Sequence, residues 1–467
     1  MRMVGLLRSM WLFPRVCRII RSVVLVTFPT EEGLRRFHRP SCFGFQSLSC
    51  IRTAPMFSTD PGRPPAPSAP EESLSGVRVL DLSGNLAGPY CGQILADLGA
   101  DVVKVERLGS GDPARAWAPP AWGGDGTLFL AANRGKRSLA LELGTREGRQ
   151  VLERLLERTD ILIQAFRPDV AERFGLQEGQ LRPRFPSLIL CTITAFGHEG
   201  PDRDRPGYDP LLQAHAGLMS VTGFPGGPPV RMGTSVVDLG AGMWAALGVL
   251  SALRARDRTE GGGAGSHVRV SLLDTAVAWV AYHLMGTEAT GVSPGPLGSG
   301  LGMIVPYGAF PAADGPLMIA AANDGLFARL SRALELPALL SDPRFATNPA
   351  RVAHRIELEG AIAEVTRSLP RVELERRLRE AGVPCAAVRT MEEVAWDPGV
   401  RDVSFREEPH PHIPGYRAVA PPPTWDGRRA PPRTPPPPVG GDTGEILQER
   451  GFAPEEIQRL REDGVIG

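Results

Sequence analysis

An aspartate at the start of a long apolar run has the surroundings in this chain that most favour chemistry. Asp238 follows a short extended run, residues 230–237, and precedes an almost entirely apolar helix predicted to end near residue 256. Because a helix that is apolar on nearly every face is buried, the carboxylate lies at the entrance to the core. The free N–H groups of a first helical turn favour an ionised carboxylate, and Gly240 and Gly242 allow a ligand or another backbone to approach closely. The alternative is a plain helix N-cap, a position at which aspartate is preferred.

Other residue types exclude several kinds of site. The six cysteines form no C-x-x-C pair and no metal-binding spacing, so no metal site is expected. Cys91, Cys191 and Cys385 stand among apolar neighbours and are predicted to be buried free thiols. The turn after the first predicted strand, SGNLAGPYCG, lacks the G-x-G-x-x-G pattern of a dinucleotide site. With a net charge of zero, the sequence indicates neither a nucleic-acid nor a membrane-surface partner.

The elements that position these residues alternate between strand and helix. Short apolar runs predict helices over residues 90–98 and 146–157, and strands at residues 77–82, 102–106, 138–143, 161–166 and 188–195. Such alternation predicts an α/β fold with a parallel, Rossmann-like sheet. A parallel sheet binds ligands beyond the carboxyl ends of its strands. We therefore expect a ligand site to collect there from loops that carry Ala87, Arg107, Leu143, Phe166 and Tyr208.

Changes in composition divide the chain into parts. Glycine and proline concentrate in the loops and linkers, whereas the middle of the chain can form a core. The last helices have nothing of their own to pack on, so they are predicted to return to the large domain. The predicted parts are a transit peptide and lead (1–72), a large Rossmann-like domain (73–285), a Gly/Pro linker (286–303), a small α+β domain (304–405), a Pro-rich linker (406–440) and C-terminal helices (441–467).

The first 72 residues have the composition of a mitochondrial transit peptide. Nine arginines stand before residue 60 against two acids, Glu31 and Glu32, with serine and apolar residues between them. The alternative is a signal anchor near residues 10–28, but arginines interrupt that stretch and no uncharged run approaches the roughly 20 residues that span a bilayer. Met56 is an alternative start. The mitochondrial matrix is the predicted location.

Several stretches, taken together, resemble one enzyme family. They include GVRVLDLSGNLAGPYCGQILADLGADVVKVERLGSGDPAR (76–115), NRGKRSLALEL (133–143) and TAFGHEGPDRDRPGYDPLLQAHAGLMSVTG (194–223). PVRMGTSVVDLGAGMWAALGVL, VPYGAF and DPRFATNPARVAHR follow in the family's order. From about residue 74 to the C-terminus, this pattern resembles the class III CoA-transferases of the CaiB/BaiF type. The resemblance implies that two chains form an interlocked homodimer.

The resemblance also implies that Asp238 is the catalytic nucleophile, because the family's nucleophile is the aspartate of this V-x-D-x-x-x-G context. The carboxylate would attack an acyl-CoA thioester to form an aspartyl–acyl anhydride, and CoA would pass to a second acid through an enzyme–CoA thioester. Succinyl-CoA is the implied donor and a dicarboxylate such as glutarate the implied acceptor. CoA thioesters are substrates, and no permanently bound cofactor is implied. Contacts with CoA carry over to Ala87, Arg107, Leu141, Leu143, Phe166, Arg173, Tyr208 and Asp209.

Several of these positions have another interpretation. Arg107 could be a solvated strand end, Arg173 an ordinary helix arginine, and Tyr208 a half-buried core residue. Arg231, which precedes Asp238 by seven residues, could bind the far carboxylate of a substrate or be purely structural. The chain also departs from the family pattern, where relatives often carry Asn, His and His, at Ala165, Leu301 and Asp442. The change at Leu301 leaves the acceptor specificity open.

Two other functions remain as alternatives. The family's 2-methylacyl-CoA racemases place a histidine immediately before the aspartate of the G-Y-D-P segment, and this chain has Tyr208 there. A phenol with a pKa of about 10 is a poor base at neutral pH, which favours the transferase. His198 and His215 fall outside that motif position. The third possibility is a catalytically silent CoA-binding dimer, which the departures from the family pattern motivate.

Overall fold

The centre of the fold is a six-stranded parallel sheet. The computed structural model describes residues 72–259, 262–431 and 433–467, so almost all of the predicted transit peptide and lead lies outside the described residues. The strand order is β5-β2-β1-β6-β7-β8, and every neighbouring pair is parallel, which confirms the predicted α/β class. The strands are β1 (Arg78–Asp81), β2 (Asp101–Glu106), β5 (Lys136–Ala140), β6 (Ile161–Gln164), β7 (Ile189–Thr194) and β8 (His267–Ser271).

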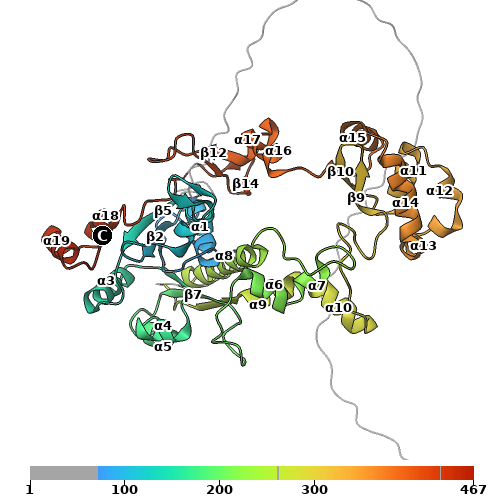
Figure 1. Cartoon of the computed structure of the whole chain (residues 1–467). Coiled ribbons are helices and arrows are strands. Elements are labelled where there is room, and N and C mark those ends of the chain that lie inside the picture. Colours follow the sequence, from blue (N-terminus) through green and yellow to red (C-terminus); the bar gives the residue numbers. More distant parts are fainter. Residues whose placement is uncertain (1–71, 260–261, 432) are drawn as a thin grey trace, which may run out of the picture. The chain divides into compact units, whose positions relative to one another are not determined.

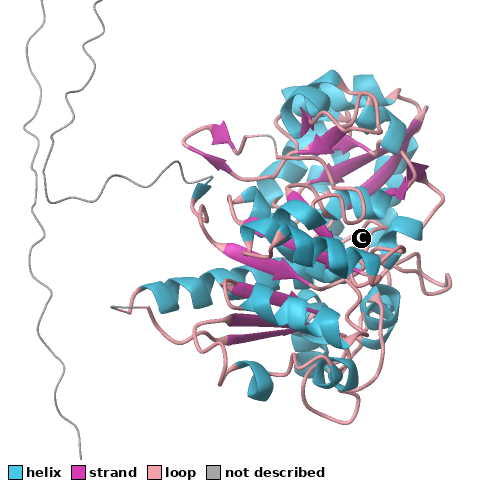
Figure 2. Cartoon of the chain, turned by 90° about the vertical axis from the view of Figure 1, so that its left-hand side faces the viewer, coloured by secondary structure: helices cyan, strands magenta, loops and turns pink. Residues whose placement is uncertain are grey.

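Helices cover both faces of this sheet because its strands are apolar on both sides. Along β1, Val79 belongs to the core on one face and Leu80 to the core on the other. The first core contains residues of α1 (Ala87–Asp97), α6 (Asp209–His215), α8 (Val236–Asp257) and α9 (Leu272–Trp279). The second contains residues of α3 (Arg146–Leu156), α4 (Pro168–Arg173), α5 (Glu178–Leu181), α18 (Thr443–Glu449) and α19 (Pro454–Glu462). Figures 1 and 2 show the strands between these helices.

Helix α8 is long and apolar, and it packs in the core against α1 (Figure 1). Its 22 residues and a mean hydropathy of 1.7 would allow it to cross a membrane by composition alone, and no other helix in the described part of the chain meets that criterion. A Cβ atom at Gly242 would lie 2.6 Å from the carbonyl oxygen of Ala87, and one at Gly240 would lie 2.8 Å from the Trp279 ring. The two glycines therefore allow close approach of a backbone and a ring, as predicted.

A separate core forms around a small antiparallel sheet. Strands β9 (Tyr307–Ala312), β10 (Gly315–Ala320) and β11 (Cys385–Ala387) pair in the order β11-β10-β9. Helices α11 (Asp324–Ala333), α14 (Arg355–Thr366) and α15 (Arg371–Glu380) contribute to its core. The mixture of helices and antiparallel strands agrees with the predicted α+β unit.

Some local structure differs from the prediction. Helix α10 (Ala281–Thr290) continues through residues 286–290 of the predicted linker and ends at Gly291, whose φ is 68°. In the predicted Pro-rich linker, β12 (Phe405–Glu407) pairs with β13 (Arg417–Val419), and β14 (Thr424–Trp425) pairs with β15 (Arg428–Arg429). Cys91 and Cys191 are buried free thiols as predicted, whereas Cys385 is partly exposed.

Candidate active site

The first turn of α8 is capped by a carboxylate from another helix. Asp238 is the third residue of α8, and Ser235 occupies the N-cap position without a side-chain hydrogen bond. The backbone N–H groups of Val237 and Asp238 donate to Oδ2 of Asp209, at 2.8 and 3.2 Å. Asp238 is therefore not the N-cap, and its carboxylate does not cap the first turn of α8.

Asp209 also fixes the segment that leads into α8, through hydrogen bonds that Gln213 makes. Its Oδ1 accepts a hydrogen bond from Nε2 of Gln213 at 2.5 Å, and Oε1 of Gln213 accepts one from the backbone N–H of Met232 at 2.8 Å. Asp209 is only 1% exposed. The sequence predicts a CoA contact here; the structure instead buries this carboxylate and bonds it to α6 and α8, since local sequence does not reveal a cap formed 28 residues away.

The surroundings of Asp238 disfavour its charged form. Burial, and then the nearby negative charge of Asp209, raise the pKa of Asp238 to about 7. The sequence predicts an ionised carboxylate stabilised by the helix start, but the N–H groups of that turn are already bonded to Asp209. A carboxyl group of this kind is partly protonated at neutral pH.

Asp238 lines a cavity of about 260 Å³ at the carboxyl ends of β6 and β7. Ala87, Phe166 and Tyr208, which the sequence predicts as CoA contacts, line the same cavity. None of its lining residues is a histidine. Tyr208 is 55% exposed, and its ring meets Trp117 edge-on with the centroids 6.2 Å apart.

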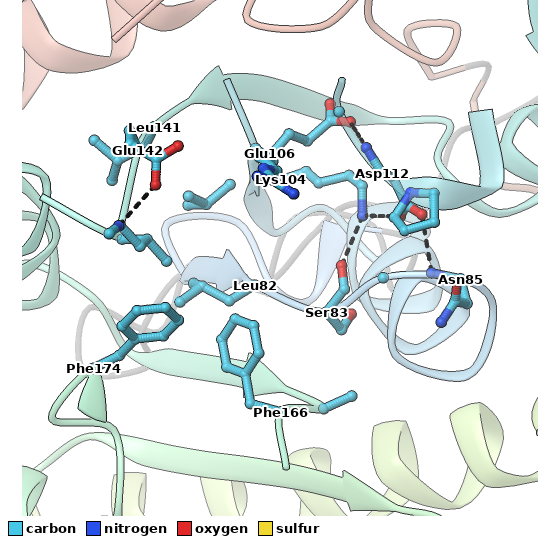
Figure 3. A pocket seen from close by; sticks show the side chains of 18 of the residues that line it. Leu82, Ser83, Asn85, Lys104, Glu106, Asp112, Leu141, Glu142, Phe166 and Phe174 are labelled. Carbon is cyan, nitrogen blue, oxygen red and sulfur yellow. Dashed lines mark hydrogen bonds and ion pairs between the residues drawn. The ribbon is translucent and has the colours of Figure 1, made fainter. Parts of the chain in front are cut away.

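A larger neighbouring cavity of about 710 Å³ holds the other predicted contacts (Figure 3). Arg107, Leu141, Leu143, Phe166 and Arg173 all line it. The two cavities share four lining residues, Gly84, Asn85, Ala165 and Phe166, so the Phe166 ring lies where they meet. Every predicted contact except Asp209 therefore lines one of two adjoining cavities.

The chain is similar to known proteins over most of its length. A family model described as CoA-transferase family III matches residues 74–443. The chain belongs to this family. The succinate–glutarate CoA-transferase of Agrobacterium fabrum is 39% identical to this chain, over 74% of this chain and 88% of that protein. The human succinyl-CoA:glutarate CoA-transferase is 32% identical, over 83% of this chain and 88% of that protein. The crystal structure of a CAIB/BAIF family protein from Brucella suis has a TM-score of 0.72 at 34% identity, and covers 81% of this chain and 100% of that chain.

A buried ionic network, which we did not predict from the sequence, holds the loops between the transferase's two cavities. Nζ of Lys104 pairs with Asp112 at 2.7 Å and donates to the carbonyl oxygen of Ser83 at 2.9 Å (Figure 3). Oδ1 of Asp112 accepts the N–H of Asn85 at 3.0 Å. Next along β2, Glu106 pairs with Arg115 at 2.7 Å. One feature of the sequence could have indicated this network. The strand V-V-K-V-E is buried on both faces, yet charged residues alternate with apolar ones in it.

A second buried lysine fixes the end of β1. Nζ of Lys136 donates to Asp81 at 2.8 Å, to Oδ1 of Asn133 at 2.8 Å and to the carbonyl oxygen of Pro89 at 2.7 Å. Burial lowers the pKa of Lys136 to about 8 despite the attraction of Asp81. All three N–H groups of the ammonium are used, so Lys136 connects β1, β5 and the first turn of α1.

The three residues that depart from the family pattern lie in different surroundings. Ala165 lines both cavities. The carbonyl oxygen of Leu301 accepts a hydrogen bond from Arg355, and Oδ2 of Asp442 accepts the N–H of Ser138 at 2.8 Å. In the described part of the chain, no group of three or more His, Cys, Asp or Glu side chains could hold a metal ion.

Proposed function

We propose that the transferase moves CoA from succinyl-CoA to a dicarboxylic acid such as glutarate, with Asp238 as the nucleophile. The observation that supports this most is the half-buried Asp238 carboxylate in a cavity that adjoins a larger one at the carboxyl ends of the sheet. Relatives named for succinyl-CoA with glutarate and with D-citramalate support the substrate class.

The proposed reaction passes CoA through two covalent states of Asp238. The carboxylate attacks the thioester carbonyl of the donor, which breaks the C–S bond and releases CoA thiolate, and a mixed anhydride forms. The thiolate attacks the aspartyl carbonyl of the anhydride, which frees the donor acid and leaves an aspartyl–CoA thioester. The acceptor carboxylate attacks this thioester to form a second anhydride, and the released thiolate then attacks its acyl carbonyl. The product is the new acyl-CoA, and Asp238 is regenerated.

The two cavities divide the proposed substrate between them. Arg107 and Arg173 supply positive charge for the CoA phosphates in the larger cavity, where Leu141, Leu143 and Phe166 provide apolar surface for the adenine. The thioester end then passes Phe166 and Ala87 to reach Asp238, near Tyr208. Burial of Asp238 raises its pKa and also keeps water from the anhydride, which would otherwise hydrolyse.

The test uses the full-length chain and three proteins: wild type, Asp238→Ala and the control Asp257→Ala, which changes an exposed aspartate at the other end of the same helix. Each is incubated with succinyl-CoA and a panel of carboxylic acids, and mass spectrometry identifies new acyl-CoAs. We expect glutaryl-CoA from wild type and Asp257→Ala, and a rate at least about a thousandfold lower from Asp238→Ala.

Equal turnover by Asp238→Ala would exclude Asp238 as the nucleophile. Exchange of an α-proton in deuterated water without CoA transfer would instead indicate the racemase, and CoA binding without either reaction would indicate the silent binder.

We place the reaction in the mitochondrial matrix on the composition of residues 1–72 alone. A fluorescent protein fused behind residues 1–72 should enter mitochondria, and a fusion that remains outside them would contradict this location.

A further inference from the structure

A third cavity, of about 440 Å³, lies beside the cavity of Asp238. We name it the side cavity and define it by Gln164, Thr192, Thr194, His198, His267 and Arg269, which line it. It shares Phe166, Pro168, Thr194, Arg203 and Asp204 with the cavity of Asp238. The two cavities therefore adjoin along these five residues.

Most polar groups on the wall of the side cavity are already bonded to one another. The N–H of Phe166 donates to Oε1 of Gln164 at 2.8 Å, and Nε2 of Gln164 donates to the Thr192 hydroxyl at 3.0 Å. Thr192 Oγ1 lies 2.9 Å from Nε2 of His267, whose Nδ1 lies 2.9 Å from a carboxylate oxygen of Glu178. Nε of Arg269 lies 3.2 Å from the same Nδ1 of His267. This chain of bonds fixes the wall and the Phe166 backbone.

Two buried polar atoms of the wall remain without a partner among the described residues. They are Oγ1 of Thr194, on the wall shared with Asp238, and Nε2 of His198. Burial, and then the positive charge of Arg269, lower the pKa of His198 to about 4, so its ring is neutral at pH 7 and Nε2 can donate. Buried polar groups without a hydrogen bond are rare and costly, so both atoms are suited to bind a ligand.

The same wall carries guanidinium groups that a ligand can recruit. Arg203 pairs with Asp204 at 3.4 Å, and both side chains are exposed. Arg269, also exposed, pairs with the partly exposed Glu178 at 3.1 Å. Exposed ion pairs of this kind contribute little to stability, so exchange of one partner for a ligand carboxylate costs little. The wall thus combines two neutral hydrogen-bonding atoms with positive charge, which is the chemistry that recognises a carboxylate.

We propose that the side cavity binds the far carboxylate of the dicarboxylic substrates while their reacting carboxyl group lies at Asp238. Thr194, His198 and Arg203 are then the residues that select a diacid over a monoacid. This inference rests on the proposed function, because donor and acceptor acyl groups exchange at the one carboxylate of Asp238. CoA lies on the other side of Phe166, in the larger cavity, and leaves the side cavity to the acyl chain.

The test compares glutarate with pentanoate, an acid of the same chain length that ends in a methyl group. The variants are Thr194→Val, which removes a hydroxyl from a β-branched residue in a strand, and His198→Leu. Thr159→Val is the matched control, because that hydroxyl donates to the carbonyl oxygen of Leu155 and lines none of the three cavities. We expect the KM for glutarate to rise about tenfold in Thr194→Val and His198→Leu, with no change for pentanoate and no change in Thr159→Val. An equal change for both acids, or none for either, would overturn the proposal.

A binding measurement keeps this test independent of turnover. Calorimetry in the presence of CoA gives the Kd of glutarate for full-length Asp238→Ala, alone and combined with Thr194→Val. A Kd about tenfold higher in the double variant supports the side cavity even if the wild-type chain transfers CoA to none of the acids. An unchanged Kd overturns the side cavity, whereas transfer to glutarate by wild type would still uphold the function proposed for Asp238.

Discussion

At Asp238 two influences act on one carboxylate in opposite directions. A helix start stabilises negative charge, yet the N–H groups of Val237 and Asp238 are bonded to Asp209, whose charge adds to the effect of burial. The residue type and its place near the helix start could be predicted from the sequence. Its pKa could not, because the dominant neighbour comes from α6 and is recognised only in the folded chain.

The pH dependence of the reaction tests this arrangement. The nucleophile is the carboxylate, and the pKa of Asp238 is about 7, so kcat/KM should fall as the pH drops through 7. Asp209→Asn removes the negative charge, so the midpoint should move down by about one pH unit. The midpoint is the readout rather than the rate, because the new amide would face Nε2 of Gln213. Asp257→Asn should keep the wild-type profile. An unmoved midpoint in Asp209→Asn would exclude Asp209 as the cause.

At the scale of elements, the strands could be predicted from the sequence where apolar runs are long. The short hairpins and the buried ion pairs that connect the strands could not. Strand β7 (Ile189–Thr194) lies within the predicted run 188–195, and β2 (Asp101–Glu106) begins one residue before its predicted run. Hairpins of two or three residues, such as β14 with β15, are too short to leave a periodic signal. Lys104 and Lys136 resemble surface lysines in the sequence, but both pair with buried aspartates. Lys104 pairs with the nearby Asp112, and Lys136 pairs with Asp81, which is 55 residues away along the chain.

Removal of one of these lysines should destabilise the sheet. Lys136→Met leaves Asp81 buried without its partner, so the free energy of unfolding should fall by about 3–5 kcal/mol. Lys136→Met combined with Asp81→Asn should recover most of that loss, because no uncompensated charge remains. The neighbouring control, Arg137→Met, breaks a partly exposed pair with Asp101 and should cost about 1 kcal/mol or less. Urea unfolding followed by circular dichroism measures all three. Equal losses for Lys136→Met and Arg137→Met would contradict the buried pair.

At the scale of the whole molecule, large apolar side chains are exposed on two helices, α8 and α10. Met243, Trp244 and Leu247 on α8, and Tyr282 and Met285 on α10, are all exposed. Soluble chains rarely leave many large apolar side chains in water, and such surfaces mark interfaces. The resemblance to the family implies which partner covers them: a second copy of this chain. A single sequence reveals the apolar composition of α8, but only the fold separates its core side from its exposed side.

The oligomeric state should therefore depend on α8 and α10. We expect a homodimer by size-exclusion chromatography with light scattering. Leu247→Lys combined with Met285→Lys should shift it toward monomer, because burial of two ammonium groups in an apolar contact is costly. Val372→Lys, at an equally apolar and exposed position on α15, should remain dimeric. A far-ultraviolet spectrum like that of wild type would separate loss of assembly from loss of folding. A well-folded double-lysine variant that stays dimeric would show that the contact between copies lies elsewhere on the surface.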